Sequence, residues 1–349
     1  MSNNNATRHG SITRRSALLG LAGSALLTAS EMARAQDQWS TIVAAAKKEG
    51  HVVIYSAFVG LAAHQDLKKD FASKFGITVD ILEARASEVR ERIRVEHAAG
   101  RYAADVSENG RTTTTLQISE DKVFDPFGPL PKLGNLKPEF SSDGMRLPIF
   151  AIIYGILANS QLVKPADEPK SWADLTDPRW KGKILSDDFR ALGGGGVLFS
   201  VLEDHFGQDF HKKLAQQDIK FSREIPANER RIARGEYPIY IPDSLTAAPT
   251  LKGLPVKFLV PKEGLPYVGY DLALVKNAPH HNAARVLMNY YLDKHMQEVF
   301  ARLGLLPVTT ETLTNIDPTI AEIQKSKLLG TTDPTRMNQM LSLAKQIYQ

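Results

Sequence analysis

The chain of 349 residues contains no cysteine, so neither a disulfide framework nor thiol chemistry is available to it. Two enzyme motifs are also missing, the His-Glu-x-x-His zinc motif and the Gly-x-Ser-x-Gly nucleophile elbow. Four of the 43 basic and one of the 39 acidic residues lie in the first 35, which leaves a balanced 39 and 38 with no basic run. These absences disfavour a catalytic zinc, covalent hydrolase chemistry and nucleic-acid binding.

The first 35 residues have the three parts of a cleaved export signal. Arg14 and Arg15 precede an apolar stretch at 17–29, and Ala33-Arg34-Ala35 forms a small-x-small cleavage site. The apolar stretch is too short to span a bilayer, which needs about 20 residues. The paired arginines predict the twin-arginine route, with Sec export as the alternative. No cysteine follows for a lipid anchor, so we expect a periplasmic protein that is not embedded in the membrane.

Strand and helix patterns alternate after residue 36, which predicts an α/β fold with a mostly parallel sheet. The apolar stretch at 51–57 reads as a buried strand, and Leu67, Phe71 and Phe75 recur every four residues on one helix face. A long apolar segment at 146–163 predicts a strand between two lobes. The last residues, 318–349, read as helices interrupted by Gly-Thr-Thr-Asp-Pro.

Four stretches give the chain a family resemblance: "KKEGHVVIYSA", "KSWADLTDPRWKGKILSDD", "RIARGEYPIYIPDS" and the long run from "VKFLVPKEG" to "FARLGLLPV". They resemble the type II periplasmic solute-binding proteins of ABC importers, in the branch with ferric-iron, thiamine, phosphonate and sugar-phosphate binders. The resemblance implies two α/β lobes joined by hinge strands around a ligand cleft. Lobe 1 would use 37–147 plus 263–310, lobe 2 and the hinge strands 148–262, and residues 311–349 would form C-terminal helices.

The stretch "SDDFRALGGGG" places a polar turn and four glycines between a strand and a helix. In the resembling family this turn faces the cleft, where Arg190 would hold an anion and the amides of Gly194 and Gly195 would add donors. The alternative is that Arg190 pairs with Asp187 or Asp188 while the glycines only permit close packing. The stretch is not a phosphate-binding P-loop, because no Lys-Ser/Thr pair follows the glycines.

Other candidates follow the ends of predicted strands or lie on the inter-lobe strands. For most of them a structural role is an equal alternative: a packed turn at 56–58, a helix N-cap near 112 and at 243–244, or a strand aromatic in the core. The predicted ligand-binding residues are Ser56, Phe58, Asn109, Arg111, Thr112, Tyr154, Asp188, Arg190, Gly194, Gly195, Asp243, Ser244 and Tyr270.

The sequence of the segment 241–247 argues against ferric iron as the ligand. Relatives that bind ferric iron carry two adjacent tyrosines in this neighbourhood, whereas Asp243, Ser244 and Leu245 stand here. The pair Tyr290-Tyr291 lies within a predicted amphipathic helix and is expected in the core.

Together these observations predict a periplasmic substrate-binding protein that captures a small organic anion and delivers it to the membrane permease of an ABC importer. The anion would be a carboxylate, a phosphonate or a sugar phosphate. We expect a monomer without a resident metal or cofactor, and not an enzyme. Two alternatives stay open: a ferric-iron-binding protein, and an exported enzyme on the same scaffold.

Overall fold

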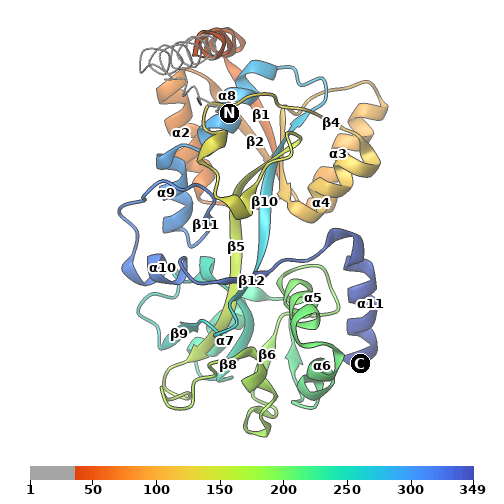
Figure 1. The fold of residues 1–349 in the computed structure, drawn as a ribbon, viewed down its shortest axis with the longest axis vertical. Coiled ribbons are helices and arrows are strands. Elements are labelled where there is room, and N and C mark those ends of the chain that lie inside the picture. The colour runs from red at the N-terminus through yellow and green to blue at the C-terminus, as the bar shows by residue number, and fades with distance from the viewer. Residues whose placement is uncertain (1–35) are drawn as a thin grey trace, which may run out of the picture.

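The computed structural model describes residues 36–349, which form two α/β lobes connected by long shared strands (Figure 1). The export-signal prediction concerns residues 1–35 and lies outside the described residues. The strands form one continuous path in the order β2 (Thr78–Glu83), β1 (His51–Ser56), β3 (Val106–Gly110), β10 (Leu265–Val275), β5 (Arg146–Asn159), β8 (Ile239–Ser244), β6 (Ile184–Ser186) and β7 (Lys220–Phe221). This path runs from one lobe to the other, so the mostly parallel sheets of the two lobes meet at an antiparallel centre.

Lobe 1 starts with a helix at 36–49 and a parallel unit in which β1 pairs with β2 on one side and β3 on the other. The predicted helix face is confirmed, because Leu67 and Phe71 of α2 are fully buried. The elements of this part are β1 (His51–Ser56), α2 (Ala63–Phe75), β2 (Thr78–Glu83), α3 (Ala86–Ala98), β3 (Val106–Gly110), α4 (Arg111–Leu116), the π-helical turn η1 (Gln117–Asp121) and β4 (Phe124–Asp125).

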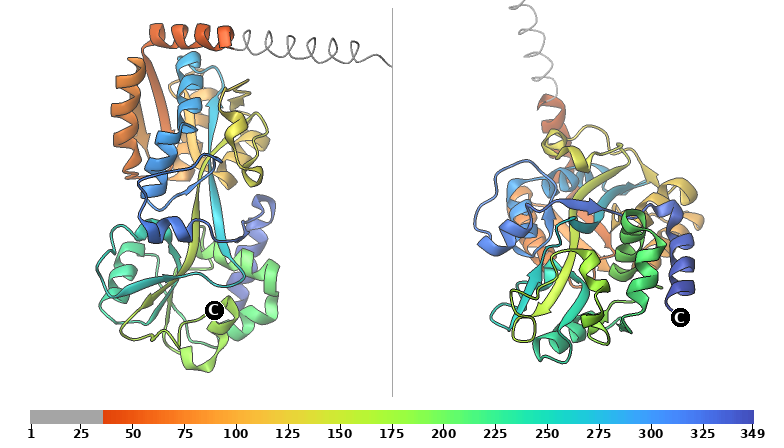
Figure 2. Two further views of the ribbon diagram at one scale, coloured as in Figure 1. Left: turned by 60° about the vertical axis from the view of Figure 1, so that its left-hand side comes forward. Right: turned by 60° about the horizontal axis from the view of Figure 1, so that its bottom comes forward.

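Two long strands connect the lobes, β5 (Arg146–Asn159) and β10 (Leu265–Val275). They pair antiparallel from Tyr267↔Ile153 to Ala273↔Arg146, and β5 then continues into lobe 2 beside β8 and β9. Nearly every residue of β5 is buried, which explains its continuous apolar sequence. Figure 2 shows these strands running from one lobe into the other.

Lobe 2 repeats the parallel arrangement around β6, which pairs with β7 and β8. Trp172 and Trp180 lie in its hydrophobic core. Its elements are β6 (Ile184–Ser186), α5 (Gly194–Phe206), α6 (Gln208–Ala215), β7 (Lys220–Phe221), α7 (Ile225–Ala233), β8 (Ile239–Ser244) and β9 (Val256–Leu259).

After β10 the chain continues in lobe 1 and then makes a third crossing between the lobes, back into lobe 2. The elements are α8 (His281–Tyr291), α9 (Lys294–Arg302), β11 (Leu306–Pro307), α10 (Pro318–Ile323), β12 (Leu328–Gly330), the 3₁₀ turn η7 (Pro334–Arg336) and α11 (Met337–Ile347). The prediction of helices alone for 318–349 missed β12. This short strand depends on its pairing with Leu265 and Pro266 of β10, which lies far away in the sequence.

Each lobe has its own large hydrophobic cluster. Leu245 directly follows β8 of lobe 2 but is fully buried in the cluster of lobe 1, so it fixes a point of contact between the lobes. Within residues 36–349, no helix is both long and apolar enough to cross a bilayer.

Candidate functional site

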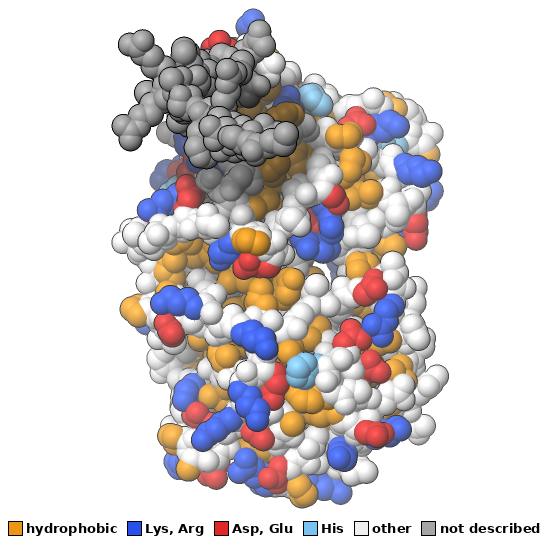
Figure 3. Space-filling view, viewed as in Figure 1, with side chains coloured by type: hydrophobic (Ala, Val, Ile, Leu, Met, Phe, Trp, Pro, Cys, Tyr) orange, Lys and Arg blue, Asp and Glu red, His pale blue; other side chains and the backbone are white. Residues whose placement is uncertain are grey.

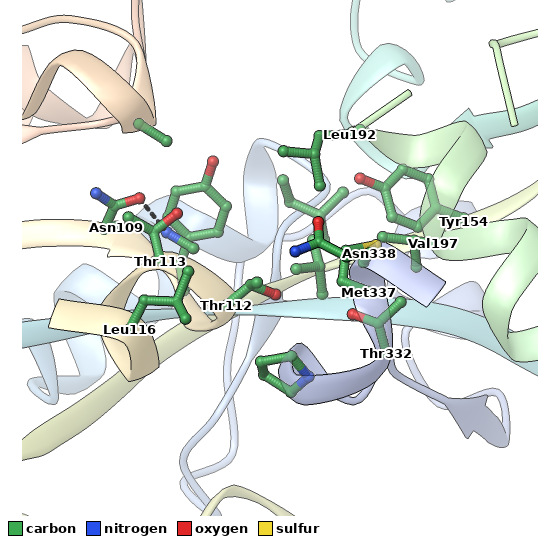
Figure 4. Close-up of a pocket in the computed structure, with 17 residues that line it drawn as sticks. Asn109, Thr112, Thr113, Leu116, Tyr154, Leu192, Val197, Thr332, Met337 and Asn338 are labelled. Carbon is green, nitrogen blue, oxygen red and sulfur yellow. Dashed lines mark hydrogen bonds between the residues drawn. The ribbon is translucent and has the colours of Figure 1, made fainter. Parts of the chain in front are cut away.

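A cleft of about 320 Å³ lies between the lobes, beside the hinge strands. Lobe 1 contributes the end of β3 and the start of α4, lobe 2 contributes the turn before α5, and β5 and β10 contribute Ile152, Tyr154, Val268 and Tyr270. Figure 4 shows Thr112, Thr113 and Leu116 on one side of the cavity and Leu192, Val197 and Asn338 on the other. The cleft therefore has one wall from each lobe.

The lining of this cleft carries no ionisable group other than tyrosine. Its 17 residues include no Asp, Glu, Lys, Arg or His, and their exposed surface is mainly apolar. The polar groups are the amides of Asn109 and Asn338, threonine hydroxyls and the phenols of Tyr154 and Tyr270. A free anion would therefore find no cationic side chain in the lining, contrary to what the sequence predicts.

Tyr154 and Tyr270 are half-buried on the two hinge strands, so the predicted pair does reach the cleft. Tyr154 lies against the start of α5, where a Cβ on Gly194 would be 3.1 Å from the tyrosine ring. Tyr270 stacks on Phe150, with 5.1 Å between the ring centroids. Burial raises the pKa of Tyr270 to about 12; burial and the nearby Tyr270 together raise the pKa of Tyr154. Both phenols are neutral near pH 7 unless a cation approaches them.

The start of α5 already holds an anion, which is the protein's own Asp187. Its carboxylate accepts hydrogen bonds from the backbone N–H of Gly195 at 2.7 Å and from that of Asp188 at 2.9 Å. Burial raises the pKa of Asp187 despite these hydrogen bonds. The glycines are required for close approach, because a Cβ on Gly195 would lie 2.6 Å from the backbone of Asp188. The helix end predicted to receive a ligand is thus occupied from within the chain.

Arg190 is not among the residues that line the cleft, and it pairs with Asp188. Its Nε donates to Asp188 Oδ1 at 2.8 Å, its Nη1 donates to the carbonyl of Tyr348, and its guanidinium stacks on Phe221. Burial opposes ionisation of Asp188, but the hydrogen bonds from Arg190 keep the pKa of that carboxyl below its usual value. The surface pairing that the sequence left as an alternative is the arrangement in the structure.

Arg111 is likewise neutralised inside lobe 1. Its Nε and Nη2 donate to the two carboxylate oxygens of Asp271, at 3.2 and 2.9 Å, and Asp271 is fully buried on β10. A Cβ on Gly269 would lie 3.2 Å from the guanidinium, so this glycine allows the arginine to lie flat on the hinge strand. Arg111 therefore connects α4 to β10 rather than lining the cleft.

Three other predicted residues, Ser56, Phe58 and Ser244, have structural contacts of their own. Ser56 is buried and its Oγ accepts from the N–H of Phe58, whose ring packs on Tyr270. Ser244 Oγ accepts from the N–H of Thr246, which is the capping role that the sequence left open. Of the thirteen predicted residues, the structure brings Asn109, Thr112, Tyr154 and Tyr270 to the lining.

Asp243 lines a different groove, about 800 Å³ in volume, on the other side of the hinge strands. On the face seen in Figure 3, hydrophobic side chains gather in the hollow between the lobes. Asp243 is 1% exposed, and its Oδ1 has no hydrogen-bond partner among the described residues. Burial and the nearby Glu229 raise the pKa of Asp243 well above its usual value. Its predicted contact with a cleft ligand is not supported by this position.

The sequence reasoning missed part of the lobe 2 wall. Leu192 and Val197 flank the glycines, and their apolar character beside a cleft-facing turn was a usable signal. Thr332, Met337 and Asn338 come from the end of the chain, and no local pattern marks them as cleft residues. Over residues 36–349 there is no group of three or more His, Asp or Glu side chains arranged to hold a metal.

The family model for bacterial extracellular solute-binding proteins matches residues 117–332. The chain belongs to this family. The resemblance predicted from the sequence is confirmed, and the family and the similar structures are binding proteins. An uncharacterized protein of Haemophilus influenzae is 24% identical over 312 residues, which cover 82% of this chain and 85% of that protein. "Iron uptake protein A1" of Synechocystis sp. is 32% identical over 122 residues, covering 34% of this chain and 33% of that protein.

Solved structures share the whole two-lobe fold. The iron- and citrate-bound IdiA (FutA) protein of Trichodesmium has a TM-score of 0.71 at 20% identity, covering 85% of this chain and 99% of that one. The ferric binding protein of Campylobacter jejuni has a TM-score of 0.69 at 17% identity, covering 85% and 98%. These likenesses confirm the predicted type II periplasmic-binding-protein architecture.

Proposed function

We propose that this protein is the solute receptor of an ABC importer and that its cargo is ferric iron held together with a small organic chelator. The observation that carries the proposal is the pair of phenols, Tyr154 and Tyr270, in a cleft that has no other ionisable group. The iron uptake of one relative and the iron and citrate of a similar structure support this cargo over the free organic anion that the sequence predicts.

The electrostatics of the cleft explain why the cargo would need both metal and chelator. Ionising both tyrosines without a cation is unfavourable, because burial raises both pKa values, with a further contribution from Tyr270 at Tyr154 and from Glu108 at Tyr270. A bound trivalent cation reverses this effect by stabilising the phenolates. Two phenolates cannot complete the coordination of a ferric ion, so the chelator would supply the remaining oxygen ligands. A chelated metal also brings little net charge into an uncharged cleft, which limits the desolvation cost.

The hinge gives the receptor its two states. Lobe 1 and lobe 2 would close on the cargo by rotation about β5 and β10, which themselves carry Tyr154 and Tyr270. Cargo that contacts both walls would favour the closed state, and the permease would recognise that state. We further propose that residues 1–35 direct export to the periplasm by the twin-arginine route.

A neutral organic solute is the second candidate, favoured by the apolar side chains in the lining. Leu116, Ile152, Leu192, Val197 and Met337 would surround a hydrocarbon or aromatic body, while the amides and hydroxyls would orient it. Such a ligand would need neither phenolate.

Titration of the purified protein with ferric citrate separates the two candidates. We expect a visible phenolate-to-iron absorption band. We also expect a higher melting temperature, because ligand at about 100 times Kd adds roughly 2.7 kcal/mol to the free energy of unfolding. Tyr154→Phe and Tyr270→Phe should each weaken binding by about tenfold or more, since each removes one anionic ligand. Tyr102→Phe is the matched control, because Tyr102 is exposed in lobe 1 and does not line the cleft. Absence of the band, with a metal-free compound recovered from the native protein by mass spectrometry, would establish the second candidate instead.

A further inference from the structure

The last part of the chain, residues 331–348, forms part of the wall on the lobe 2 side and is called here the C-terminal segment. Thr332, Pro334, Met337 and Asn338 all line the cleft. Figure 4 shows Met337 and Asn338 at the start of α11, on the opposite side of the cavity from Thr112. Three of these four residues lie beyond the region 117–332 that matches the family model.

The C-terminal segment is fixed firmly to lobe 2. Tyr348 is 4% exposed, and its hydroxyl lies 2.9 Å from His211 Nδ1. The Tyr348 ring packs edge-on against Phe189, with 5.0 Å between centroids. Met340 and Ala344 are buried in the same cluster. Arg336 adds an ion pair to Asp204 of α5 at 2.8 Å, so the segment moves with lobe 2 as one body.

The same segment is also the part of lobe 2 that approaches α4 of lobe 1. Cα atoms of η7 come within 8 Å of those of α4, and Figure 1 shows the start of α11 beneath α4. Closure about the hinge strands would bring Thr112 and Thr113 toward Met337 and Asn338. The space between these two pairs of side chains then limits the size of what can be enclosed.

We propose that the C-terminal segment determines ligand selectivity, an inference that rests on the proposed receptor function. Asn338 is exposed, makes no side-chain hydrogen bond to the described residues and would donate its amide N–H groups to hydroxyl or carboxylate oxygens of the chelator. Met337 would contact the chelator's carbon skeleton and restrict its size. Thr332 is 6% exposed at the base of this wall and fills space there.

The absence of cysteine from the sequence allows a direct test with single-cysteine variants. Asn338→Cys places a thiol at the proposed contact, and Gln339→Cys places one on the next residue, which is exposed but does not line the cleft. Gallium(III) citrate is the probe, because Ga³⁺ resembles Fe³⁺ but does not oxidise thiols. Saturating gallium citrate should slow maleimide labelling of the cysteine at 338 by about tenfold or more. The labelling rate of the cysteine at 339 should change by less than about twofold.

A selectivity measurement completes the test. Asn338→Ala should weaken binding of ferric citrate by about tenfold, through the lost hydrogen bonds to charged oxygens, and Gln339→Ala should not. Met337→Ala should improve binding of a bulkier ferric chelate relative to citrate.

If ferric and gallium citrate bind but labelling at 338 and 339 slows equally, the inference fails while the proposed function stands. If neither citrate complex binds, the proposed cargo is wrong. The labelling rates at 338 and 339 are then measured with and without whichever copurifying compound raises the melting temperature. If this compound slows labelling equally at both positions, the inference is overturned.

Discussion

The two lobes build their cleft walls in different ways. The wall of lobe 1 comes from one continuous stretch, the end of β3 and the start of α4, with Ala86 as its one other residue, whereas the wall of lobe 2 joins the turn at 192–197 to the C-terminal segment. Lobe 2 must therefore hold together two parts of the chain that are remote in sequence. Its binding surface depends on a packing anchor, Tyr348, that lies outside the cleft.

Among the described residues, each lobe also contains one buried histidine, and the pKa values of the two are shifted in opposite directions. His64 of lobe 1 lies between the carboxylates of Glu83 and Glu108, at 2.7 and 2.9 Å. Burial alone would lower its pKa, but the hydrogen bonds and charges of the two carboxylates raise it. The ring nitrogens of His211 in lobe 2 lie within hydrogen-bond distance of the Tyr348 hydroxyl and the carbonyl of Phe199, and burial lowers the pKa of His211 to about 4. The buried histidine of lobe 1 thus lies among carboxylates, whereas that of lobe 2 lies among uncharged groups.

The largest effect should come from removing the anchor of lobe 2. Tyr348→Ala deletes a buried aromatic ring and should lower the free energy of unfolding by about 4 kcal/mol. Tyr102→Ala, at a tyrosine that is 38% exposed in lobe 1, should change it by less than about 0.5 kcal/mol. Urea unfolding measures both values. Equal, small losses would mean that lobe 2 does not depend on the C-terminal segment.

The two paired arginines provide a second contrast between the lobes. Arg111→Met leaves the fully buried Asp271 without its partner and should destabilise the protein by about 3 kcal/mol. Arg190→Met leaves Asp188 in a partly exposed position, where solvent screens the charge, and should cost less than about 1 kcal/mol. Ligand affinity per folded molecule should change in neither variant. A selective loss of affinity in Arg190→Met would restore the anion-binding role that the sequence predicts.

Lowering the pH should change the contributions of His211 and His64 to the free energy of unfolding in opposite directions. The folded-state pKa of His211 lies below its unfolded value of about 6.5, so the unfolded chain binds the proton first as the pH falls. At about pH 5 this should remove roughly 2 kcal/mol of stability, and His211→Gln should abolish that dependence. The raised pKa of His64 means that its contribution is fully present below about pH 6.5 and is lost as the pH rises through the folded-state value. Unfolding midpoints at about pH 5 and 7.5 for the wild type, His211→Gln and His64→Gln would show whether the two slopes have opposite signs.

The sequence by itself determined the α/β class, the hinge strand at 146–159 and the two tyrosines that reach the cleft, because these depend on local apolar patterns and on strand position. It also located the glycine turn, since only glycine permits the approach seen at Gly195. Which group binds at that turn was decided by the tertiary structure. The hydrogen-bond donors and arginines that sequence reasoning assigned to a ligand are instead paired with Asp187, Asp188 and Asp271. No local sequence pattern shows which acidic residue will pair with a given arginine. The third crossing between the lobes was likewise decided by folding, because β12 and α11 take their positions from strands and aromatic rings far away along the chain.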